Sequence, residues 1–163
     1  MKEAVILLVE DNEMDVELTL DAFEHAGLTN KVQVVRNGEQ ALDYLMGRGE
    51  YADRVQFPMP DLVLLDLHLP GMSGQEVLTD LKTRPGLKRL PIVILTSSKQ
   101  DADRMESYDN GANSFLVKPV GFMNFVEVAR TVGDYWLTLN VAPPTLESSG
   151  HQPPDIRSHD DTP

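Results

Sequence analysis

The sequence predicts a doubly wound α/β fold whose five-stranded parallel sheet is built from five β-α units, (β/α)5, and three observations point to it. Short apolar runs of strand length alternate with longer amphipathic segments. Most of these runs are continuously hydrophobic, as expected of parallel strands that helices cover on both faces. Since crossover connections between parallel strands are right-handed, the helices are expected on both sides of one sheet.

Each element follows from a local pattern. The apolar runs that predict strands cover residues 4–9, 32–35, 62–65, 92–95 and 114–117. Apolar residues three or four positions apart predict helices around Val16, Leu20 and Phe23, around Ala41 and Leu45, around Val77 and Leu81, and around Phe125, Ala129, Val132 and Trp136. Turn residues mark the limits of these helices: Gly27 after the first, Gly38 and Ser73-Gly74 before the next two, and Pro85-Gly86 after the third.

Charge and composition narrow the range of functions. The 163 residues include 14 Lys and Arg against 26 Asp and Glu, for a net charge of −12, so the chain repels nucleic-acid phosphates and is not expected to bind them. The absence of cysteine excludes disulfides, thiolate zinc sites and thiol nucleophiles. Because no apolar run could span a membrane and no signal-peptide pattern is present, we expect a cytoplasmic chain without membrane contact.

The composition changes near Ala142. Residues 143–163 contain five of the eleven prolines, four acidic residues, one arginine and almost no large apolar side chains. Such a segment cannot bury enough apolar surface to offset the entropy lost on ordering. We therefore expect one folded domain over residues 1–142 and a disordered, proline-rich acidic tail over residues 143–163.

Polar residues follow the predicted strands at the points where the strands end. Glu10 and Asp11 follow the first strand, Asp66 the third, Thr96 the fourth and Lys118 the fifth. The carboxyl ends of parallel strands share one edge of the sheet, where ligands bind. Clustered carboxylates favour a hard cation such as Mg²⁺, and one aspartate can then attack a phosphoryl group while lysine and hydroxyl groups neutralise charge. The sequence therefore predicts phosphoryl transfer to a carboxylate.

Four segments carry a specific resemblance. They are LVEDN at 8–12, LDLHLPGMSG at 65–74, LTSS at 95–98 and GANSFLVKP at 111–119. In this order, each at a strand end, they resemble the receiver domain of two-component response regulators, of the single-domain chemotaxis Y protein type. The resemblance covers residues 4 to about 140 and implies the flavodoxin-like strand order 2-1-3-4-5.

The resemblance also implies roles for the acidic residues. Asp66 would accept the phosphoryl group from a phosphohistidine of a histidine kinase or a histidine phosphotransferase. Asp11, Asp66 and the backbone carbonyl of His68 would bind Mg²⁺ directly, and Glu10 would act mostly through water. The chain would then be a phosphoacceptor signalling protein and not an enzyme, limited to its own phosphorylation and dephosphorylation.

Further roles are implied for the residues of the last two strands. Lys118 would pair with the carboxylate and later with the phosphoryl oxygens, and the bond between Lys118 and Pro119 would be cis. Thr96 would hydrogen-bond the phosphoryl group, and Phe115 would turn into the space that Thr96 leaves. Many receivers have tyrosine where Phe115 stands, so a steric switch is expected here without a phenol hydroxyl.

Two side chains flank the expected route of water to the acyl phosphate. His68 lies two residues after the acceptor, and Ser98 lies two residues after Thr96. We expect them to tune the lifetime of the phosphoryl group.

A narrower resemblance rests on two features. The connection Gly47–Pro60 is long for a receiver, and the last helix is expected to continue past Trp136 to about Asn140. Both features resemble the single-domain regulators that are paired with bacterial phytochrome histidine kinases. That resemblance implies a homodimer through the fourth helix, the fifth strand and the fifth helix.

Three alternatives stay open. A phosphohydrolase with an aspartyl-phosphate intermediate would usually have a second acid two residues after the nucleophile, where His68 stands. A flavodoxin-like cofactor binder would have small or hydroxyl residues after the first strand, where the turn Glu10-Asp11-Asn12-Glu13 is acidic. A pseudo-receiver that binds partners without phosphorylation would not need the full set of site residues.

Overall fold

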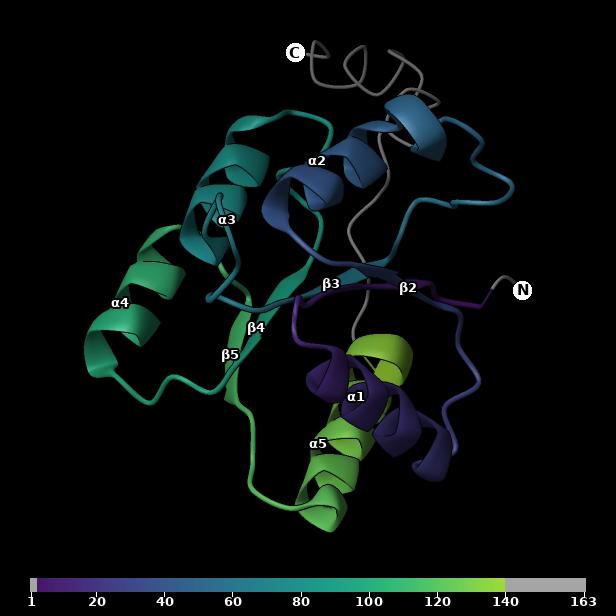
Figure 1. The fold of residues 1–163 in the computed structure, drawn as a ribbon, viewed down its shortest axis with the longest axis vertical. Helices are drawn as coiled ribbons and strands as arrows, with labels where there is room; N and C mark the ends of the chain where they lie inside the picture. The colour runs from purple at the N-terminus through teal and green to yellow at the C-terminus, as the bar shows by residue number, and fades with distance from the viewer. Residues whose placement is uncertain (1–2, 140–163) are drawn as a thin grey trace, which may run out of the picture.

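Five parallel strands form one sheet through the centre of the protein, with helices on both sides (Figure 1). The computed structural model describes residues 3–139. The strands are β1 (Ile6–Val9), β2 (Val32–Val35), β3 (Leu62–Leu65), β4 (Ile92–Thr96) and β5 (Ser114–Val117), in the spatial order β2-β1-β3-β4-β5. The doubly wound α/β class and the strand order 2-1-3-4-5 are therefore confirmed.

The helices alternate with the strands along the chain. They are α1 (Glu13–His25), α2 (Gly38–Met46), α3 (Gly74–Thr83), α4 (Asp101–Asp109) and α5 (Phe122–Asp134). A turn of π-helix, Tyr135–Leu139, continues α5, and a 3-10 turn, Gly49–Tyr51, follows α2. The expected helix end near Asn140, the domain boundary at 142 and the tail over 143–163 lie outside the described residues.

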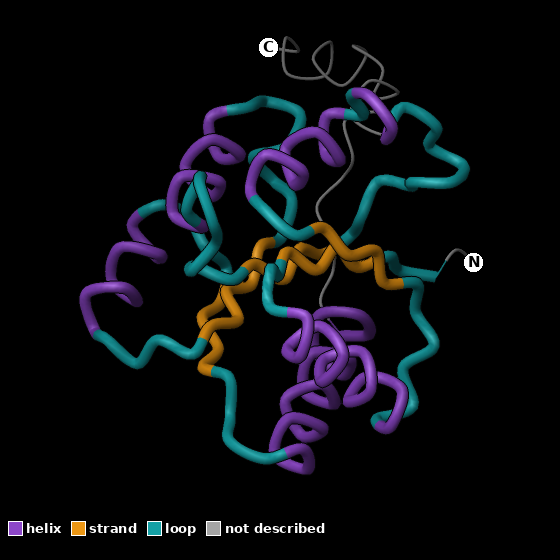
Figure 2. Tube along the Cα trace, in the orientation of Figure 1, coloured by secondary structure: helices purple, strands orange, loops and turns teal. Residues whose placement is uncertain are grey.

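Alternate residues of each central strand face opposite sides of the sheet. In β1, Leu7 and Val9 pack against α2 and α3, whereas Ile6 and Leu8 pack against α1 and α5. Figures 1 and 2 show these two helical layers, above and below the sheet. Because both faces are covered, every residue of β1, β3 and β4 is buried, which explains their continuous apolar runs.

Helix α4 is attached mainly by polar contacts. Among its residues only Ser107 is buried, whereas Met105 and Tyr108 are exposed. The side-chain amide of Gln75 on α3 donates to the Ser107 hydroxyl at 2.8 Å and accepts a hydrogen bond from Asn110 at 2.9 Å. This helix therefore lacks the apolar spacing that marks the other helices.

The long connection after α2 is tied to that helix by Arg54. Its guanidinium donates to the carbonyl oxygens of Tyr44 at 2.7 Å and Leu45 at 2.9 Å, which lie in the last turn of α2. The Tyr44 hydroxyl donates to the carbonyl oxygen of Pro58 at 2.7 Å. The connection is thus an ordered part of the domain.

No helix among the described residues is long and apolar enough to cross a membrane.

Candidate functional site

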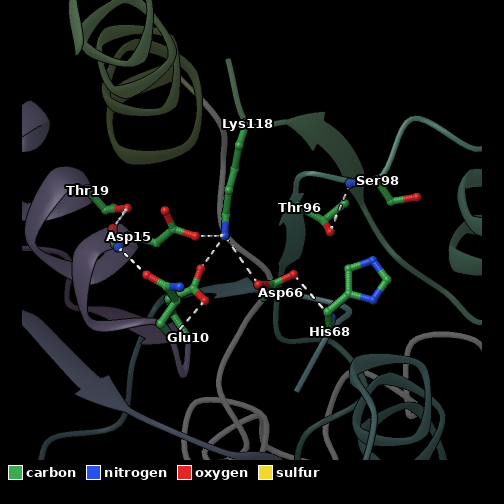
Figure 3. A network of polar contacts seen from close by, with 9 residues as sticks. Glu10, Asp15, Thr19, Asp66, His68, Thr96, Ser98 and Lys118 are labelled. Atoms are coloured by element: carbon green, nitrogen blue, oxygen red, sulfur yellow. Dashed lines mark hydrogen bonds and ion pairs between the residues drawn. The ribbon is translucent and has the colours of Figure 1, made fainter. Parts of the chain in front are cut away.

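The strand ends bring the polar residues predicted from the sequence to one edge of the sheet (Figure 3). Glu10 and Asp11 follow β1, and Asp66 follows β3, its neighbour in the sheet. The chain continues from β1 to β2 on one side and adds β3 on the other, so the strand order reverses between β1 and β3. This is where doubly wound sheets bind their ligands.

Lys118, which follows β5, lies at the centre of the site. Its ammonium nitrogen Nζ lies 3.2 Å from Asp66 Oδ2 and 3.0 Å from Asp15 Oδ2, and it also donates to Glu10 Oε1. The side chain of Lys118 is 8% exposed, and that of Glu10 is 2% exposed. An ammonium group has three N–H donors, so each of them has a carboxylate partner here.

Burial and charge act in opposite directions on this cluster. Burial lowers the pKa of Lys118, but its hydrogen bond to Glu10 and the negative charge of Asp66 outweigh burial and raise the pKa above its ordinary value. For Glu10 burial dominates, and with the charge of Asp66 it outweighs the contact with Lys118 and raises the pKa to about 7. Lys118 is therefore a permanent cation, whereas Glu10 can exchange a proton near neutral pH.

The carboxylates fit a divalent metal ion. Glu10, Asp11 and Asp66 each offer one oxygen atom, and these atoms all lie within 4.8 Å of one another. Asp11 is exposed, whereas the other two are buried, so a cation could enter from solvent on the Asp11 side. An oxygen-only set of three carboxylates suits a hard divalent cation.

The backbone around Asp66 holds its carboxylate in place. Its own N–H donates to the Val9 carbonyl oxygen at 3.1 Å, extending the pairing of β1 and β3 by one residue. The N–H of His68 donates to Asp66 Oδ1 at 3.2 Å. Asp66 Oδ1 and Oδ2 thus each have a donor, the amide on one side and Lys118 on the other, as Figure 3 shows.

Thr96 and Phe115 lie on the β4–β5 side of the site. Thr96 is buried at the end of β4, and its Oγ1 accepts a hydrogen bond from the Ser98 N–H at 3.3 Å. The Ser98 hydroxyl donates to Asp103 in the first turn of α4. Phe115 is half-buried and packs against the core between the sheet and the α2–α3 layer.

One expected feature is wrong. The bond between Lys118 and Pro119 is trans, and no peptide bond within residues 3–139 is cis. The trans form is favoured before proline by about 0.5–1 kcal/mol, so a cis bond needs a local reason. Here the chain turns from β5 into α5 at Gly121, whose φ of 93° only glycine adopts readily.

Asp15 was not predicted from the sequence, although it contacts Lys118. Asn12 caps α1 by accepting a hydrogen bond from the Asp15 N–H at 3.0 Å, which places Asp15 in the first helical turn. An acidic residue in the first turn of a helix is common for electrostatic reasons alone. In the sequence, the spacing between the cap Asn12 and Asp15 indicates only that Asp15 lies in the first turn of a helix. It does not indicate that the side chain contacts a lysine 103 residues away.

Comparison with known proteins agrees with this geometry. Residues 6–130 match the response regulator receiver domain family. The chain is 39% identical over 142 residues to the probable methanogenesis regulatory protein FilR2 of Methanothrix harundinacea, covering 85% of this chain and 87% of that protein. It is 35% identical over 133 residues to the response regulator Rcp1 of Synechocystis, covering 82% of this chain and 88% of that protein.

Solved structures give the same result. The phosphorylated cyanobacterial phytochrome response regulator RcpA superimposes with a TM-score of 0.80 at 36% identity, over 87% of this chain and 99% of that one. The Mn²⁺-bound form of Rcp1 gives 0.77 at 34% identity, over 86% and 99%. The bacteriophytochrome response regulator AtBRR gives 0.69 at 45% identity, over 86% and 100%. Fold, site and sequence thus agree, and the chain belongs to the response regulator receiver domain family of two-component signalling proteins.

Proposed function

We propose that this protein is a single-domain response regulator that accepts a phosphoryl group on Asp66. The observation that carries the proposal is the position of the Asp66 carboxylate. It lies beside Glu10 and Asp11, with Lys118 Nζ at 3.2 Å from one oxygen and the His68 N–H at 3.2 Å from the other. A nucleophile, two further acids and a fixed cation are the groups that phosphoryl transfer to a carboxylate needs.

The transfer balances without a co-reactant. A carboxylate oxygen of Asp66 forms a bond to phosphorus, and the bond between phosphorus and the imidazole nitrogen of the donor histidine breaks. The imidazole leaves with the electron pair, so no separate base is required at Asp66. Lys118 neutralises charge on the phosphoryl oxygens, and the His68 N–H keeps the carboxylate oriented.

We propose Mg²⁺ as the metal, held by Asp11 and Asp66 with the His68 carbonyl, and with Glu10 acting mostly through water. The ion would supply charge neutralisation for the phosphoryl oxygens. The Mn²⁺-bound form of the relative Rcp1 supports a divalent cation in a receiver of this kind.

The signal is proposed to leave the site through Thr96. Its Oγ1 accepts a hydrogen bond from the Ser98 N–H, and the Ser98 hydroxyl donates to Asp103 on α4. When Thr96 turns toward a phosphoryl group on Asp66, the bond to Ser98 is lost and α4 shifts, while Phe115 fills the vacated space. His68 and Ser98 would set the lifetime of the phosphoryl group by controlling the approach of water.

Acetyl phosphate provides a direct test. With Mg²⁺ present, we expect nearly every molecule of the full chain to gain one phosphoryl group, detected as a retarded band in a phosphate-affinity gel. Chelation of the metal should prevent labelling. Absence of labelling at saturating acetyl phosphate and Mg²⁺ would contradict the proposal.

The pKa of Glu10 predicts a pH dependence of metal affinity. Because burial raises this pKa to about 7, Glu10 is mostly protonated below that pH and contributes little negative charge there. We expect the Mg²⁺ affinity, measured by calorimetry, to fall about tenfold from about pH 8 to about pH 6. The Glu10→Gln variant should bind more weakly throughout and lose this slope, and an unchanged slope in that variant would assign the dependence elsewhere.

We propose a phytochrome-type histidine kinase as the phosphoryl donor, because the relative RcpA is a cyanobacterial phytochrome response regulator and AtBRR is a bacteriophytochrome response regulator. Transfer from such a kinase should be faster than transfer from unrelated histidine kinases at equal concentration. Equal rates would remove the support for this pathway.

We also propose that the protein forms a homodimer through α4, β5 and α5. Exposed apolar side chains on α4 and α5, namely Met105, Tyr108 and Met123, support this surface. Light scattering should show the mass of a dimer, with or without the phosphoryl mimic beryllofluoride. A monomer under both conditions would contradict it.

A further inference from the structure

The first turn of α1 holds Asp15 firmly beside the site. The Asp15 N–H donates to the Asn12 side chain at 3.0 Å. The Thr19 hydroxyl donates to the Asp15 carbonyl oxygen at 2.7 Å, as Figure 3 shows. Thr19 is buried, and its hydroxyl lies one turn along the same helix. The backbone of Asp15 is therefore fixed on both sides, and its carboxylate extends to Lys118.

The contact of Asp15 with the site is made through the lysine. Its Oδ2 lies 3.0 Å from Lys118 Nζ, the shorter of the two distances that Nζ makes to aspartate oxygens. Among the described residues, the oxygen atoms gathered closely enough for a metal belong to Glu10, Asp11 and Asp66. Asp15 is outside that group, so its carboxylate serves the ammonium group alone.

This difference matters when a metal ion and a phosphoryl group occupy the site. The other two partners of Lys118, Glu10 and Asp66, belong to the metal-facing group, and Asp66 would also bond to phosphorus. Both would then share their oxygen acceptors with other groups. A lysine side chain has about 2 kcal/mol of rotamer entropy, so it does not stay at one point without a hydrogen-bond acceptor. Asp15 is the partner whose acceptor oxygen is not shared.

We propose that Asp15 is a positioning residue for phosphoryl transfer: it holds the Lys118 ammonium where the phosphoryl oxygens on Asp66 gain charge. The inference rests on the proposed function, because it assigns a role in that reaction. Asp15 does not touch the phosphoryl group and acts only through Lys118. Its loss should therefore affect the rate of transfer more than the binding of metal.

Two substitutions separate position from charge. Asp15→Ala removes the acceptor, whereas Asp15→Asn keeps an oxygen acceptor for Lys118 and removes only the charge. Glu17→Ala is the matched control, since Glu17 is an exposed acid on the same helix. We expect Asp15→Ala to lower the rate of labelling by acetyl phosphate about tenfold, with Asp15→Asn and Glu17→Ala within about threefold of the wild type. The Mg²⁺ dissociation constant should change less than about twofold in all three variants.

A second measurement needs neither metal nor phosphate. An ammonium group with three carboxylate partners exchanges its protons slowly, so the Lys118 NH₃⁺ group should give a resolved signal in a ¹H–¹⁵N NMR spectrum. We expect Asp15→Ala to broaden or remove this signal, and Asp15→Asn and Glu17→Ala to keep it. If Asp15→Ala removed the signal only by destabilising α1, Asp15→Asn would not be expected to restore it.

The outcomes separate the two proposals. If the wild type is not labelled, the proposed function fails, and the NMR signal still decides whether Asp15 holds Lys118. If the wild type is labelled and Asp15→Ala is labelled equally fast, the positioning role is wrong. It is also wrong if Asp15→Asn is as slow as Asp15→Ala, or if Mg²⁺ affinity falls in proportion to the rate.

Discussion

Asp66→Asn is expected to abolish labelling by acetyl phosphate, with a loss of at least about a thousandfold in rate. The amide has nearly the same shape as the carboxylate, so the hydrogen bond from the His68 N–H to its oxygen can remain. It lacks the negative oxygen that must form the bond to phosphorus. The substitution therefore removes the nucleophile together with one of the three carboxylates of the metal group.

Asp61→Asn is the matched control for this substitution. Asp61 is exposed at the opposite end of β3, where its carboxylate accepts a hydrogen bond from the Val5 N–H at 2.8 Å. This variant should be labelled at the wild-type rate. A second comparison, Asp11→Asn, should be labelled slowly and recover at high Mg²⁺, because it keeps the nucleophile and weakens the metal site. Labelling of Asp66→Asn at the wild-type level would show that another residue accepts the phosphoryl group.

The strands could be predicted closely because strands that are buried on both faces have continuous apolar runs in the sequence. The predicted ranges 32–35, 62–65 and 114–117 coincide with β2, β3 and β5, and the first strand begins two residues later than expected, at Ile6. Because the strands are parallel, the polar residue that follows each run lies at the same edge of the sheet. Glu10, Asp66 and Lys118 could be brought together on this basis.

Helix α4 and Asp15 could not be predicted in the same way. Helix α4 is attached through Gln75 and Ser107 and leaves Met105 exposed, so its sequence has no apolar stripe. Asp15 meets Lys118 across 103 residues of sequence, and the direction of one side chain decides the contact. Local patterns record burial along an element, whereas such contacts depend on how two elements are placed together.

The error at Lys118 and Pro119 has a different origin. The cis bond was expected from the resemblance to receivers, and no local pattern in this sequence required it. The trans bond and the turn at Gly121 satisfy the same connection from β5 to α5.

Gly74→Ala is expected to lower the free energy of unfolding by about 3 kcal/mol, through a clash beneath the phosphoacceptor. A Cβ at this first residue of α3 would lie 2.3 Å from the Asp66 carbonyl oxygen and 2.6 Å from Leu67 Cα. Both neighbours are backbone atoms, so no side chain can turn away. Helix propensity alone would favour alanine over glycine by about 1 kcal/mol. A decrease in the free energy of unfolding would therefore show that the clash outweighs helix propensity. Urea unfolding followed by circular dichroism measures the change.

Gly27→Ala separates this clash from a general effect of replacing glycine. Gly27 has a φ of 84°, and a Cβ there would meet no heavy atom within 4 Å. The free energy of unfolding should therefore fall only by the strain of a left-handed backbone at alanine, about 1–2 kcal/mol. The two variants should also differ in labelling, because only Gly74→Ala displaces the backbone that carries Asp66. Gly27→Ala should be labelled at the wild-type rate, and Gly74→Ala more slowly even at a temperature where it is fully folded. Wild-type stability for Gly74→Ala would mean that the loop between β3 and α3 can move away from α3 at little cost, and the fixed position of Asp66 would then need another explanation.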